Sequence, residues 1–103
     1  MLINDLKLTL DQLNQIILAC RPDELSLGER SGLWAATRQI CADLDEHIRD
    51  NLSANGYALE KCVSVRWHVG AALGFDEDNG HDAQAHRVWA LGSLETLKGV
   101  ISA

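Results

Sequence analysis

Apolar side chains recur every three or four residues through four separate segments of this chain, which is the period of an amphipathic α-helix. The clearest segment follows Ser26 and Glu29, whose spacing is that of a capping box at a helix N-terminus. Its apolar stripe consists of Leu33, Thr37, Ile40, Leu44, Ile48 and Leu52. The Asn-Gly pairs at 55–56 and 79–80 lack the alternating apolar flanks of a β-hairpin. The sequence therefore predicts an all-α fold.

The flanking residues suggest where each helix begins and ends. Thr9 and Gln12 resemble a second capping box, with Leu8 and Leu13 placed for a hydrophobic staple, so we expect a first helix from about Leu10. Residues 1–8 would then form a preceding turn or an extended arm. Because the residue before a proline avoids the α conformation, Arg21-Pro22 should end this helix.

The second helix is expected to be the longest and to end at a C-cap formed by Asn55 and Gly56. A third helix is predicted over about residues 58–73 and a fourth over about 82–100. The stripe of the third is Leu59, Cys62, Val63, Val69 and Leu73, with Arg66 inside it. The stripe of the fourth is Val88, Leu91, Leu94, Leu97 and Ile101. Short connections between these segments favour a small antiparallel helical bundle of about four helices.

Length and charge limit the partners of such a bundle. The 103 residues suit one domain, so we treat residues 1–103 as a single helical domain. A net charge of -6 repels phosphate backbones and anionic lipid surfaces, which disfavours direct binding to nucleic acid or to a membrane. Three cysteines without a CxxC pair, and a polar N-terminal segment, favour a reduced cytoplasmic protein.

Residues with catalytic or metal-binding chemistry form no recognisable motif. Asp76, Asp78 and Asp82 echo the start of a calcium loop, but the positions that need Gly and Glu hold His81 and Arg87. No Glu-x-x-His pair accompanies His47, His68, His81 and His86, and most of these are expected near the surface. Cys41 and His68 would make a nucleophile and base only if the bundle brought them together. We therefore expect buried structural thiols and predict no catalytic residue, metal or cofactor.

Three of the five aromatic residues are tryptophans, each on a different predicted helix and each beside the main apolar stripe of that helix. Tryptophan and arginine are enriched at binding hot spots, although burial at the edge of a core explains such tryptophans somewhat better. The residues predicted to bind a partner are Val65, Arg66, Trp67, Arg87 and Trp89. Val65, Trp67 and Trp89 lie off the predicted buried stripes, as do the small residues Gly70, Ala71 and Ala72. Left open, they would form an apolar surface, for which a homodimer through the third and fourth helices is the commonest solution.

The leading hypothesis is a non-enzymatic helical interaction module, a regulator or inhibitor that acts by occupying a protein partner. The alternative is a small metal-binding or enzymatic bundle that uses histidine and carboxylate side chains. A weaker alternative is an acidic mimic of nucleic acid. It requires the acidic groups at 43–50 and 76–82 to lie on one face.

Overall fold

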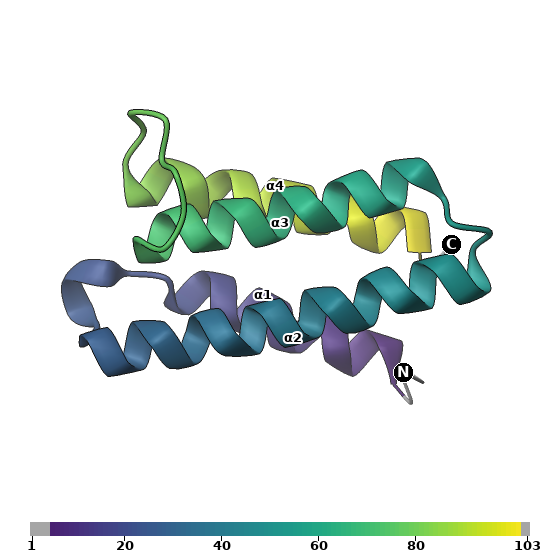
Figure 1. Cartoon of the computed structure of the whole chain (residues 1–103), viewed down its shortest axis with the longest axis horizontal. Coiled ribbons are helices and arrows are strands. Elements are labelled where there is room, and N and C mark those ends of the chain that lie inside the picture. The colour runs from purple at the N-terminus through teal and green to yellow at the C-terminus, as the bar shows by residue number, and fades with distance from the viewer. Residues whose placement is uncertain (1–4, 102–103) are drawn as a thin grey trace.

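The computed structural model describes residues 5–101, and these residues form an all-α bundle. The α-helices are α1 (Leu6–Ala19), α2 (Leu27–Asn51), α3 (Gly56–Leu73) and α4 (Ala83–Ile101), with a short 3-10 turn, η1 (Pro22–Glu24), between α1 and α2. In Figure 1, α1 and α2 make the lower layer and α3 and α4 the upper layer, and successive helices run in opposite directions. Because α4 also packs on α1, the four helices close into a ring around one core, which confirms the predicted bundle.

The N-terminus of α2 is capped as the sequence predicts. The Ser26 hydroxyl accepts a hydrogen bond from the Glu29 amide at 3.1 Å, and the Ser26 amide donates to Glu29 Oε1 at 2.9 Å. Each bond satisfies an amide that has no partner within the helix. With 25 residues, α2 is the longest helix of the described chain, as expected.

The predicted start of the first helix is wrong. Helix α1 begins at Leu6, because the Asp5 carboxylate caps it by accepting from the Leu8 amide at 2.9 Å. Thr9 lies inside the helix, where its hydroxyl donates to the Asp5 carbonyl, and Leu8 is exposed, so no staple forms. Residues 1–4 of the expected arm lie outside the described residues. The predicted stop before Pro22 is confirmed, since α1 ends at Ala19.

The connection between α2 and α3 also differs from the prediction. Helix α2 ends at Asn51, and Ser53 and Ala54 reverse the chain with left-handed φ values of 54° and 53°. The Asn55 side chain then accepts hydrogen bonds from the amides of Tyr57 and Ala58. Asn55 is therefore the N-cap of α3 and not part of a C-cap of α2, a role that asparagine fills equally well.

The core confirms the stripes of α2 and α4 in part and corrects that of α3. Leu44, Ile48, Leu94 and Leu97 are completely buried, as their spacing predicts. Val63 and Val88, expected inside, are instead half exposed. The buried positions that replace them are Ala58, Val65, Ala72, His86 and Ala90. Three of these five residues are alanines, which let α3 and α4 pack closely, so the buried face is not the one with the most large aliphatic side chains.

No helix among residues 5–101 has the length and apolar character needed to cross a bilayer.

Candidate functional site

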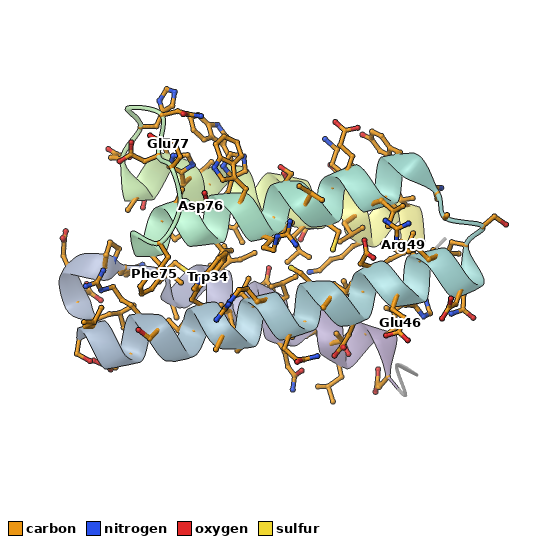
Figure 2. All side chains as sticks on the ribbon, in the orientation of Figure 1. Trp34, Glu46, Arg49, Phe75, Asp76 and Glu77 are labelled. Carbon is orange, nitrogen blue, oxygen red and sulfur yellow. The ribbon has the colours of Figure 1, made fainter. Side chains whose placement is uncertain are left out.

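The segment between α3 and α4, residues 74–82, is fixed to the end of the bundle on both of its sides. Figure 2 shows Phe75 facing Trp34 of α2, and the two rings stack with centroids 6.4 Å apart. Further along, the Trp67 indole nitrogen donates to the Glu77 carbonyl at 2.9 Å. His86 Nε2 lies 2.7 Å from the Asp78 carbonyl. This connection is thereby held against three different helices.

Five aromatic rings meet beside this connection. We call Trp67, His68, His81, His86 and Trp89 the His–Trp cluster. Its rings pack with offset or edge-on geometry, the arrangement that aromatic pairs prefer. The Trp89 ring lies 4.8 Å from His81, 5.4 Å from His86 and 5.5 Å from His68, measured between centroids. Although 40% exposed, Trp89 is therefore held in one orientation by three imidazoles.

Two of these histidines are joined by a direct hydrogen bond. His68 Nδ1 and His86 Nδ1 are 2.9 Å apart, and His86 is completely buried. Because a carbonyl only accepts, the 2.7 Å contact with Asp78 requires the proton of His86 to be on Nε2. In the neutral pair His86 Nδ1 then accepts from His68 Nδ1. His68 Nε2 is thus the unprotonated nitrogen that the His68–His86 bond does not use, and a single added proton there leaves that bond intact.

Burial and the neighbouring His86 lower the pKa of His68 below its ordinary value of 6.5. As the pH falls, the unfolded chain therefore takes up this proton before the folded chain does. The stabilisation is fully present above pH 6.5 and is lost between 6.5 and the lower pKa of the folded state. We expect the free energy of unfolding, measured by urea titration, to fall as the pH is lowered through this range. His68→Gln, which keeps an amide donor but does not titrate, should weaken this dependence; an unchanged pH profile would contradict the assignment.

The cluster forms one end of a surface groove between α3 and α4, which we call the α3–α4 groove. Its volume is about 430 Å³, and it is lined by Lys61, His68, Val88, Trp89, Gly92, Ser93 and Thr96. Ser64 and Ser93 hydrogen-bond to each other at 2.8 Å and tie the two helices together beside it. The half-exposed Tyr57 ring lies 5.2 Å from the Lys61 ammonium. Apolar and small side chains thus dominate a groove with a single ammonium group in its wall.

The residues predicted to bind a partner do not form one surface. Trp67 and Trp89 belong to the His–Trp cluster, whereas Arg66 lines a pocket between α2 and α3 and Arg87 lines another beside Asp82 and η1. The expectation that Val65 lies outside the buried stripe is wrong, because its side chain is completely buried. Gly70, Ala71 and Ala72 are buried as well, so they are not the uncovered surface expected of them.

The histidine prediction is also corrected. His68 and His86 are buried, contrary to the expected surface position, and the structure pairs His68 with His86 and Cys41 with Cys62. The spacing in the sequence is consistent with their burial, because His68 comes three residues after the buried Val65 and His86 four residues before the buried Ala90. Their burial was not predicted, because neither of the apolar stripes chosen for these two helices includes position 68 or position 86.

Geometric support for a metal site or for an acidic mimic is lacking in the described part of the chain. Residues 5–101 contain no group of three or more histidine, cysteine or acidic side chains arranged to hold a metal ion. Asp76, Asp78 and Asp82 each accept a hydrogen bond from a nearby backbone amide, as turn and cap residues do. The acidic groups at 43–50 and 76–82 lie near opposite ends of a bundle 38 Å long (Figure 1).

Comparisons with models of known protein families, with curated proteins and with solved structures find no match to this chain. Its function is therefore inferred from its residues and their geometry.

Proposed function

We propose that this protein is a non-enzymatic interaction module, a regulator or inhibitor that binds a partner protein in the α3–α4 groove. The observation that carries the proposal is the state of Trp89, whose ring is 40% exposed yet packed against three imidazoles. A tryptophan that is already ordered loses little conformational entropy on binding, and tryptophan is enriched among the residues that dominate interface energies.

The rest of the groove supports the same function. Gly92 has no side chain and Ser93 a small one, so a partner backbone can approach α4 closely beside Trp89. Val88 in the groove wall and Tyr57 beside Lys61 are 52% and 53% exposed and add apolar surface. The net charge of -6 disfavours an anionic polymer as the partner. A protein segment with an apolar side chain facing Trp89 fits this surface, in the reducing cytoplasm that three free thiols suit.

A second copy of the chain is the first occupant to test. Symmetric dimers are the commonest soluble oligomers, and a twofold axis along the groove would cover Trp89 and Val88 of both copies. The groove, rather than Val65 or the small residues 70–72, would then form the interface.

A photo-crosslinking residue placed in the groove tests this function. The proper position is Gly92, because a Cβ added there meets no atom within 4 Å. Gly32 of α2 is an exposed helical glycine with the same free space and serves as the matched control. After illumination of cells that make the protein, we expect a covalent adduct at position 92 and none at position 32. An adduct of twice the chain mass identifies a homodimer, and any other mass identifies a different protein.

The anchoring role of Trp89 is tested in the same cells. Trp89→Ala in the position-92 protein should abolish the adduct, whereas Leu27→Ala, which removes an exposed leucine of α2, should leave it unchanged. Equal adducts at positions 92 and 32 would show that this groove is not the binding site, and an adduct that survives Trp89→Ala would show that Trp89 does not anchor the partner.

A further inference from the structure

Two cysteines from different helices meet at a pocket that the proposed function does not use. Cys41 of α2 and Cys62 of α3 lie side by side where these helices pack together, and the Cys62 thiol donates to the Cys41 carbonyl at 3.3 Å. A pocket of about 330 Å³ opens beside them and is lined by Cys41, Ala42, Asp45, Cys62, Val63 and Arg66. Both thiols are therefore shielded by the bundle and at the same time adjoin a space that a small reagent can enter.

The surroundings make the two thiols unequal. A hydrogen bond with Cys41 lowers the pKa of Cys62 below its ordinary value of 9.0, against the opposing effects of burial and of Asp45. The same hydrogen bond and burial raise the pKa of Cys41. The Arg66 guanidinium, at the pocket wall, favours the thiolate form of both. Cys62 is thus the sulfur that ionises first, with the Cys41 thiol beside it as a proton donor.

We propose that Cys41 and Cys62 are a redox-active pair that forms a reversible disulfide between α2 and α3 by exchange with a low-molecular-weight disulfide. Three features of the structure support this proposal: the two sulfurs come from packed helices, they share one pocket, and a cation lines that pocket. The proposal is independent of the α3–α4 groove, which lies between a different pair of helices.

The exchange proceeds in two steps. The Cys62 thiolate attacks one sulfur of the small disulfide, a new S–S bond forms, the old one breaks, and the departing thiolate takes up a proton. Cys41 then loses its proton and attacks Cys62 Sγ, which closes the bond between the helices and releases the second small thiol. The two protein thiols give up two protons and two electrons in all. The small disulfide receives both and leaves as two thiols.

The third cysteine is an internal control. Cys20 is also buried, and its thiol donates to the Ile16 carbonyl at 3.2 Å, but no second cysteine adjoins it. Burial raises the pKa of Cys20 to about 11. Compared with a thiol of pKa 9.0 or below, Cys20 has a thiolate fraction that is at least about a hundredfold smaller. A thiolate of higher pKa is more nucleophilic, and this offsets about tenfold of the difference in rate. Cys62 should therefore react at least about tenfold faster than Cys20 in the folded protein.

The experiment uses the folded, reduced protein and oxidised glutathione at neutral pH. Samples are quenched with acid, alkylated and analysed by intact mass and by peptide mapping. We expect a product that is lighter by two hydrogen atoms before alkylation, with a Cys41–Cys62 crosslink and Cys20 alkylated. Cys20→Ala should give the same crosslink at the same rate. Cys41→Ala, with its fold checked by circular dichroism, should stop with one glutathione on Cys62.

Arg66→Gln tests whether the guanidinium activates Cys62 or whether the two thiols are only adjacent. Loss of the guanidinium should slow the first step at neutral pH and move the pH profile of the rate to higher pH. Any of three results would overturn the proposal: all three thiols persist while the urea-unfolded chain reacts, Cys20 reacts as fast as Cys62, or the wild-type protein stops at the mixed disulfide.

Discussion

Leu94→Ala and Leu44→Ala should each lower the free energy of unfolding by about 2–5 kcal/mol, the range for leucines that leave a cavity in a packed core. Both side chains are completely buried, and they enter the core from α4 and α2, respectively. Each truncation removes contacts with the surrounding side chains, and close packing around the site limits how far the structure can collapse into the space. Urea titrations followed by circular dichroism measure these losses.

Val88→Ala is the matched control for the α4 substitution, because Val88 lies on the same helix but is half exposed. Alanine also has the higher helix propensity, so we expect a change within about 0.5 kcal/mol of zero. If Leu94→Ala lowered the free energy of unfolding by less than about 1 kcal/mol, or Val88→Ala lowered it by more than that, α4 would present a different face to the core.

How much of this fold was predictable differs from helix to helix. In α2, the capping box at Ser26 and the spacing of Leu44 and Ile48 act within one helix, so the sequence alone was sufficient. In α3, the small residues Ala58 and Ala72 lie on the buried face, and residue type does not distinguish the buried Val65 from the half-exposed Val63. Periodicity therefore predicts that a helix is present more reliably than it predicts which face is buried, when apolar and small residues lie all around the helix.

The candidate site depended on contacts that no local pattern records. Trp89 stands out in the sequence as one of three tryptophans, but its orientation is set by histidines from α3, from α4 and from the connection between them. The pairs His68–His86 and Cys41–Cys62 each join two helices, so their chemistry exists only after the helices pack. Asn55 shows the same limit at shorter range, because an asparagine between two helices can cap either one.

Gly70→Ala should destabilise the protein by about 1–3 kcal/mol, the usual cost of forcing an extra group into a packed core. A Cβ at position 70 would lie 2.7 Å from Trp34 Cη2 and 3.1 Å from the Asp76 Cβ, closer than carbon atoms approach without movement. The Trp34 ring cannot retreat freely, because it stacks on Phe75 and an Arg38 guanidinium lies 5.6 Å from its centroid. Figure 2 shows Trp34 and Phe75 together at this end of the bundle, so the added methyl group also disturbs residues 74–82.

Gly92→Ala in α4 should have the opposite effect on the free energy of unfolding. No atom lies within 4 Å of a Cβ at position 92, so the substitution adds helix propensity without a clash and should raise stability by up to about 1 kcal/mol. Trp34→Leu identifies the cause of the loss at position 70: if the indole is the obstacle, Gly70→Ala should cost less in the Trp34→Leu background than in the wild-type protein. Urea titrations of the four proteins of this cycle measure the coupling. Equal costs in both backgrounds would mean that the close approach of α2 and α3 at Gly70 does not depend on Trp34.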